Sequence, residues 1–257
     1  MSELFCTTLW NAVRKKQESV QIIKGLICGD NNLIVSESDS FRIRFLLQMI
    51  IDMANPNCSS FLDRFAIEKR YGKYSVLFIN TENGLKNIKD ALRDVSYGMD
   101  NQLIIDTISN INFIDCYGKS NLVNDKNNLL KLLYGVIENE NPYLIVIDTY
   151  SGLNKKMECE VSENQVINDL SEITFITQQY GIPMILTNKI KVNNPNLDDA
   201  LRSSIAFTNW SDNIIWLKKN GNDSCSLKKI KSGNEFLTDN SEIGIKFDGK
   251  RFYATGY

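Results

Sequence analysis

The chain has 257 residues, of which 43% are hydrophobic and 23% are charged, and its formal net charge is −2. It is long enough to bury a substantial core, and it lacks the general basic excess of a protein that binds nucleic acid over its whole surface. No apolar run reaches the about 18 residues of a membrane span, and the N-terminus carries charges in place of an apolar signal core. We therefore expect no membrane association and a cytoplasmic location (or a nuclear one, if the source is eukaryotic).

Histidine is absent, and the six cysteines are scattered singly along the chain. The lack of imidazole excludes Ser–His–Asp triads and most catalytic zinc sites. The cysteines form no C-x-x-C pair, so the sequence predicts neither a zinc site nor a disulfide framework, and we expect no metal site of this kind. Any chemistry must then depend on carboxylates, lysine, arginine or a bound ligand.

Short apolar runs rich in branched residues predict buried strands. Both faces of these runs are apolar, which is typical of parallel strands covered by helices on each side. The runs are residues 32–35, 74–80, 111–115, 143–148 and 183–188.

Segments with helical spacing lie between these runs, at residues 42–54, 83–99, 126–140 and 163–181. The alternation predicts an α/β fold with a mostly parallel sheet flanked by helices. Near the end, Asn220-Gly221 and Asp248-Gly249 each lie between strand-like runs and predict antiparallel hairpins. We expect a single domain over 1–257, with a helical N-terminal lead-in (1–31), a parallel core (32–217) and C-terminal hairpins (218–257).

Two carboxylates follow strand-like runs, Glu82 after the second and Asp148 after the fourth. Ligands of open α/β sheets bind beyond the carboxyl ends of the strands. A strand, a loop and a helix beside two such carboxylates are arranged as in a P-loop ATPase, where one carboxylate organises the metal and the other polarises the attacking water. Each carboxylate alone can also serve only to cap a turn or a helix.

Several blocks, in order, resemble the RecA-like P-loop ATPases, and most closely the RepA-like branch related to DnaB-type hexameric helicases. The resemblance covers roughly residues 24–250. It rests on "GLICGDNNLIV", "FLDRFAIEKRYGKYSVLFINTE", "NPYLIVIDTYSGL", "QQYGIPMILTNKIK", "DDALRSSIAFTNWSDNIIWLKK" and "LKKIKSGNE".

The resemblance implies roles for particular residues. Glu82 stands at the position of the catalytic glutamate and Asp148 at that of the metal-organising aspartate. Thr187 and Asn188 stand where the family usually has a His-rich sensor. The remaining matches are the trans-acting basic residues Lys229 and Lys231, and Lys191 and Arg202 as candidates in a DNA-facing loop that also carries acidic residues. The resemblance further implies a homo-oligomer, or a hetero-oligomer with another RecA-like subunit, and possible contact with nucleic acid.

The phosphate-binding loop departs from the family pattern G-x-x-x-x-G-K-[ST]. The aligned residues are Ser36, Glu37, Ser38, Asp39, Ser40, Phe41, Arg42 and Ile43. Both glycines, the lysine and the hydroxyl residue are therefore replaced. The loop loses the backbone freedom that lets N–H groups approach a phosphate, and Glu37 and Asp39 bring negative charge towards it.

These replacements predict that ATP hydrolysis is lost or very weak and that no cofactor is bound. We expect the Phe41 ring to fill the phosphate space, and Arg42 to form an ion pair with Asp148 or Glu82 in the place of metal and phosphate. The protein would then be a non-hydrolysing structural or regulatory component of a DNA replication, recombination or mobile-element assembly. The alternative is an active ATP-dependent helicase or ATPase that binds ATP and Mg²⁺ through an atypical loop.

Lysines cluster in the first C-terminal hairpin, at positions 218, 219, 228, 229 and 231. Lysine commonly protects an exposed edge strand against unwanted pairing. The alternative is a basic surface that contacts a neighbouring subunit or nucleic acid.

Overall fold

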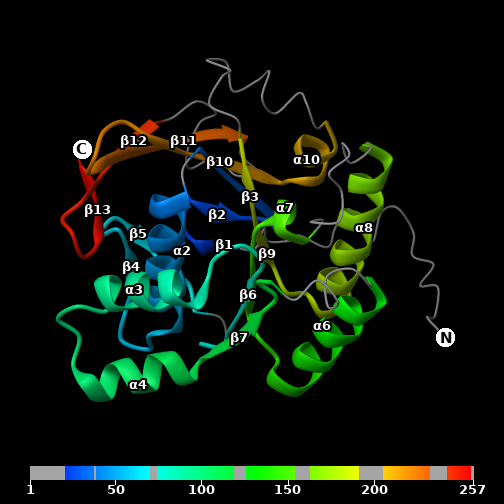
Figure 1. The fold of residues 1–257 in the computed structure, drawn as a ribbon, viewed down its shortest axis with the longest axis horizontal. Helices are drawn as coiled ribbons and strands as arrows, with labels where there is room; N and C mark the ends of the chain where they lie inside the picture. The colour runs from blue at the N-terminus through cyan, green and yellow to red at the C-terminus, as the bar shows by residue number, and fades with distance from the viewer. Residues whose placement is uncertain are drawn as a thin grey trace, which may run out of the picture.

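A nine-stranded sheet forms the centre of the protein (Figure 1), with the strand order β13-β12-β11-β10-β3-β9-β8-β6-β7. The computed structural model describes residues 21–37, 39–69, 74–118, 126–153, 163–190, 205–231 and 242–255. The five predicted runs are all strands: β3 (Asn31–Ser36), β6 (Val76–Asn80), β7 (Ile111–Asp115), β8 (Leu144–Asp148) and β9 (Met184–Lys189). They pair in parallel, which confirms the predicted α/β class.

Helices cover both faces of the parallel strands. On one side lie α2 (Asp39–Ala54) and α3 (Leu85–Val95), with α4 (Asn101–Ser109) next to them. On the other side lie α6 (Lys126–Glu140), α7 (Tyr150–Leu153), α8 (Glu163–Tyr180) and α10 (Ile205–Trp210). Alternate residues of one strand enter different cores, because Ile34 packs with α2 whereas Leu33 and Val35 pack with α7 and α8.

Four further strands extend the sheet beyond β3. β10 (Asn213–Lys219) is parallel to β3 and antiparallel to β11 (Ser224–Lys231), and β12 (Glu242–Phe247) and β13 (Phe252–Thr255) continue the antiparallel part. Both predicted hairpins are therefore present. The lysine-rich strands β10 and β11 are interior strands, so the expectation that their lysines protect a sheet edge is wrong.

The N-terminal lead-in is not helical where the structure describes it. Residues Gln21–Ile23 (β1) and Ile27–Cys28 (β2) form a small antiparallel hairpin, and Gly25 turns the chain with a φ of 79°. Its apolar side chains are buried in the core on the α2 side. A second short hairpin, β4 (Ser60–Phe61) with β5 (Phe65–Ala66), lies on the same side. The predicted lead-in residues 1–20 lie outside the described part.

A glutamine of α2 lies against the outer edge of β13. Gln48 Nε2 donates a hydrogen bond to the carbonyl oxygen of Phe252 (2.9 Å), and the Phe252 N–H donates to Gln48 Oε1 (2.6 Å). The Ala254 N–H donates to the carbonyl of Leu62 (3.3 Å). Among the described helices, none is long and apolar enough to span a bilayer.

Candidate nucleotide site

The site predicted from the sequence lies where four neighbouring parallel strands end. β3, β9, β8 and β6 are consecutive in the sheet, so their carboxyl ends share one edge. This edge brings together Ser36 from β3, Lys189 from β9, Asp148 from β8 and, two residues beyond β6, Glu82.

Arg42, in the first turns of α2, connects the two carboxylates. Its Nε donates to Asp148 Oδ1 at 2.8 Å, and its Nη2 donates to Glu82 Oε2 at 2.8 Å. The side chains of Arg42 and Asp148 have no exposed surface, and that of Glu82 is 18% exposed. Nη1 also lies 3.5 Å from Ser36 Oγ. The ion pair expected from the sequence is thus present, and it engages both carboxylates.

Asp148 is held by further donors. The Thr187 hydroxyl donates to Oδ1 (2.7 Å), and Asn83 Nδ2 donates to Oδ2 (2.8 Å). Burial raises the pKa of the Asp148 carboxyl above its ordinary value, while the Arg42 guanidinium and the Thr187 hydroxyl act in the opposite direction. Both oxygens of this carboxylate are therefore engaged by the protein's own donors.

Glu82 is the more accessible carboxylate of the two. Its Oε2 accepts from the Thr149 hydroxyl (3.1 Å) as well as from Arg42. Its Oε1 forms an ion pair with Lys189 at the end of β9. Two cations thus face one glutamate, and the site contains its own counter-charges.

The aligned phosphate-loop residues do not form a cradle. Ser36 is buried at the end of β3, and Glu37 is half-buried in the bend that follows. Ser38 and the side chains of Asp39 and Ser40 lie outside the described part. Ile43 is packed in the core on the α2 side.

The expectation that Phe41 fills the phosphate space is wrong. Its ring packs against Phe247 and Phe252, with centroid distances of 6.2 and 5.8 Å, beside the C-terminal hairpin. Lys219 Nζ lies 5.2 Å from the ring centroid. The helix turns Phe41 towards this apolar cluster, and the neighbouring Arg42 faces the strand ends instead.

The remaining candidates are placed as follows. Thr187 faces Asp148, whereas Asn188 is half-buried on the opposite side of the strand, as alternation requires. Lys191 and Arg202, and with them the predicted DNA-facing loop, lie outside the described residues.

The two predicted trans-acting lysines point inwards. Lys229 is 2% exposed, and its Nζ donates to the carbonyl of Gly25 (3.3 Å). Lys231 Nζ donates to the carbonyls of Thr208 (2.9 Å) and Ser211, at and just beyond the C-terminal end of α10, where a cation is favoured. In this structure both amines stabilise their own subunit, so a role in a neighbouring site is not compatible with their placement.

Sequence reasoning missed three residues of the site: Asn83, Thr149 and Lys189. Each lies at or within three residues of a strand end, and that position was the available signal. Thr149 is fixed by Thr81, whose hydroxyl donates to the Thr149 carbonyl (2.9 Å) and accepts from the Thr149 N–H (2.7 Å).

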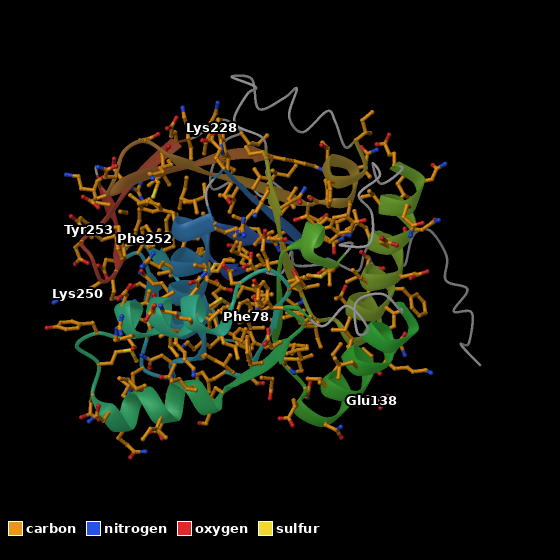
Figure 2. The ribbon with its side chains drawn as sticks, viewed as in Figure 1. Phe78, Glu138, Lys228, Lys250, Phe252 and Tyr253 are labelled. Carbon is orange, nitrogen blue, oxygen red and sulfur yellow. The ribbon has the colours of Figure 1, made fainter. Side chains whose placement is uncertain are left out.

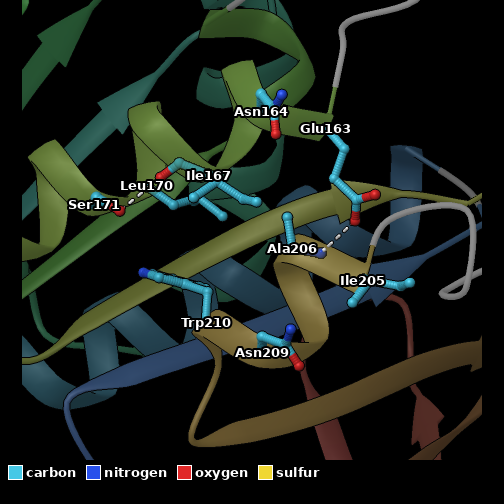
Figure 3. A pocket seen from close by; sticks show the side chains of 9 residues that line it. All are labelled: Glu163, Asn164, Ile167, Leu170, Ser171, Ile205, Ala206, Asn209 and Trp210. Atoms are coloured by element: carbon cyan, nitrogen blue, oxygen red, sulfur yellow. Dashed lines mark hydrogen bonds between the residues drawn. The ribbon is translucent and has the colours of Figure 1, made fainter.

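A separate cavity of about 520 Å³ lies between α8 and α10 (Figure 3). The polar groups on it join the two helices: the Ala206 N–H donates to Glu163 Oε1 (3.0 Å), and Trp210 Nε1 donates to Thr174 Oγ1 (2.6 Å). These contacts explain how α10 is held, and the cavity contributes nothing to the carboxylate site.

The comparisons with known proteins agree with this fold. No protein-family model matches the sequence, and no curated protein matches it either. The structure is similar to a KaiC-like protein from the hyperthermophilic archaeon Pyrococcus horikoshii OT3, with a TM-score of 0.62 and 15% identity over 91% of this chain and 94% of that one. It is also similar to the ATPase domain of a helicase, with a TM-score of 0.61 and 16% identity over 88% of this chain and 85% of that one. The chain therefore has a RecA-like fold of the type found in such ATPase domains.

Proposed function

We propose that this protein is a non-hydrolysing RecA-like protein in which Arg42 takes the place of the metal and the terminal phosphate. The observation that carries the proposal is the buried guanidinium, 2.8 Å from Asp148 and 2.8 Å from Glu82. These are the two carboxylates that the family resemblance assigns to metal organisation and to water activation.

The residues present do not fit Mg²⁺ and ATP. Magnesium needs near-octahedral oxygen ligands, but both oxygens of Asp148 accept bonds from protein donors. Freeing them requires breaking a buried ion pair, which costs about 3–5 kcal/mol. Ile43 replaces the hydroxyl ligand, and Phe41 replaces the glycine that allows a close approach to phosphate.

Such a protein acts as a structural or regulatory component of an assembly, as a homo-oligomer or beside an active RecA-like subunit. The similarity to a helicase ATPase domain supports a place in DNA replication, recombination or a mobile element. This part of the proposal rests on the fold, which by itself does not specify function.

The first test is calorimetric titration with ATP and Mg²⁺, together with a sensitive phosphate-release assay. We expect neither saturable heat nor turnover from the wild-type protein. A variant that combines Phe41→Gly, Arg42→Lys and Ile43→Thr recovers three family residues, and any nucleotide binding it gains shows that the assay can detect a restored site. Micromolar binding by the wild type that is abolished by Asp148→Asn would overturn the proposal in favour of an active ATPase.

The assembly is tested by native mass measurement on the full chain, alone and with candidate RecA-like partners. We expect a defined oligomer whose mass does not change with ATP. A mass that remains that of one chain under every condition would contradict the structural role.

A further inference from the structure

The antiparallel half of the sheet presents one polar face. Strand register places Trp216 beside Lys228 and Glu242, Lys218 beside Ser226 and Gly244, and Ser224 beside Lys246 and Tyr253. Because side chains alternate along strands, these three rows share one face. We call it the lysine face and define it by Lys218, Ser226, Lys228, Gly244, Lys246 and Tyr253.

The opposite face of the same strands is buried. Leu217, Leu227 and Ile245 pack into the core on the α2 side. Figure 2 shows Lys228 on the side of β11 that faces away from α2, and Tyr253 pointing outwards while Phe252 points inwards. The lysine face is therefore the outer surface of this part of the sheet.

The charge on this face has no internal explanation. Residues 205–231 and 242–255 carry eight basic and four acidic side chains, although the whole chain has net charge −2. Within the described part of the chain, no carboxylate is in salt-bridge contact with Lys218, Lys228 or Lys246. The neighbouring Glu242 accepts from Ser226 Oγ (2.6 Å). The strands are interior, so protection of an edge does not account for the lysines.

The lysines are spaced over three adjacent strands. Strands lie about 4.8 Å apart and two residues advance about 6.8 Å, so Lys218 is about 8 Å from Lys228 and about 12 Å from Lys246 at the backbone. Ser226 and Gly244 lie between them in the middle row and leave a low floor. Tyr253, 37% exposed, is the cross-strand neighbour of Lys246.

We propose that the lysine face binds single-stranded nucleic acid, with the three lysines contacting phosphates and the Tyr253 ring stacking on a base. An amine array with an accessible aromatic ring suits a single strand, whose bases are free to stack, better than a duplex, whose bases are paired. This inference does not depend on the nucleotide site or on the proposed loss of hydrolysis.

Fluorescence anisotropy with labelled oligo-dT and oligo-U, without nucleotide, tests the inference across salt concentrations. Three phosphate contacts predict a log–log salt slope of about −2 for a single strand, so the Kd should weaken about 16-fold between 50 and 200 mM salt. In the triple variant Lys218→Gln/Lys228→Gln/Lys246→Gln the slope should approach zero. Tyr253→Leu should weaken binding about 5-fold or more with the slope unchanged.

The matched control is Lys86→Gln/Lys89→Gln/Lys250→Gln, which removes the same charge from exposed positions elsewhere. It should keep both the affinity and the slope of the wild type, and thermal melts should show all variants folded. The inference is overturned if the two triple variants lose binding equally, if a duplex competes as well as the single strand, or if polyglutamate does. Because nucleotide is absent throughout, any of these results leaves the ATP titration unaffected.

Discussion

Replacing Arg42 by methionine tests the central contact of the site. The substitution leaves Asp148, with no exposed surface, and Glu82, 18% exposed, without the guanidinium that bonds to each at 2.8 Å. Removing one partner of a buried ion pair costs about 3–5 kcal/mol, because the remaining charge stays desolvated. We expect Arg42→Met to lower the free energy of unfolding by that amount, measured by urea denaturation monitored by circular dichroism.

Arg44 provides the matched control two residues along the same helix. Its Nε lies 2.9 Å from Asp94 Oδ2, but the two side chains are 31% and 24% exposed. Solvent screens such a pair, so Arg44→Met should cost about 1 kcal/mol or less. A cost for Arg42→Met no larger than that of Arg44→Met would refute the reasoning, because burial would then not matter.

The double variant Arg42→Met/Asp148→Asn separates charge from packing. If the loss in Arg42→Met comes from the unpaired carboxylate, the second substitution should recover a large part of it, with a coupling free energy above about 1 kcal/mol. A further expectation is that millimolar Mg²⁺ raises the melting temperature of Arg42→Met and leaves that of the wild type unchanged, since only the variant has free carboxylates.

Two glycines and two cysteines supply further predictions. A Cβ at residue 152 would lie 2.0 Å from Thr81 Oγ1, so Gly152→Ala should destabilise by about 1–3 kcal/mol in thermal melts, whereas Gly135→Ala, with no atom within 4 Å, should stabilise by about 0.5–1 kcal/mol; equal effects would show that the contact is not tight. Burial raises the pKa of Cys225 from 9.0 to about 12, so its thiolate fraction at pH 8 falls about a thousand-fold. Timed alkylation followed by mass spectrometry should label half-buried Cys58 well before Cys225, and comparable labelling rates would contradict the burial.

The sequence predicted the parallel strands because their signal is local. Runs such as "YLIVID" are apolar on both faces, and only a strand covered on both sides explains that pattern. The helix α10 and the hairpin β1–β2 were missed, since α10 is only six residues long and the hairpin is set by burial against residues distant in sequence.

The site was predictable in part for the same reason. Glu82 and Asp148 follow strand ends, and the order of strands in a RecA-like sheet brings those ends together. The direction of the Phe41 ring was not predictable, because it depends on Phe247 and Phe252, about 200 residues further along the chain. The inward turn of Lys229 likewise depends on strand register, which the lysine-rich sequence alone does not define.

Gln48 gives the sheet a chemical terminus at β13. Its amide group meets the N–H and C=O of Phe252 as a neighbouring strand would, and Leu62 takes the next N–H. A foreign strand seeking to join the sheet at β13 would have to displace a buried side chain before forming its first hydrogen bond. This edge is thereby guarded against fibril-like stacking of one copy on another.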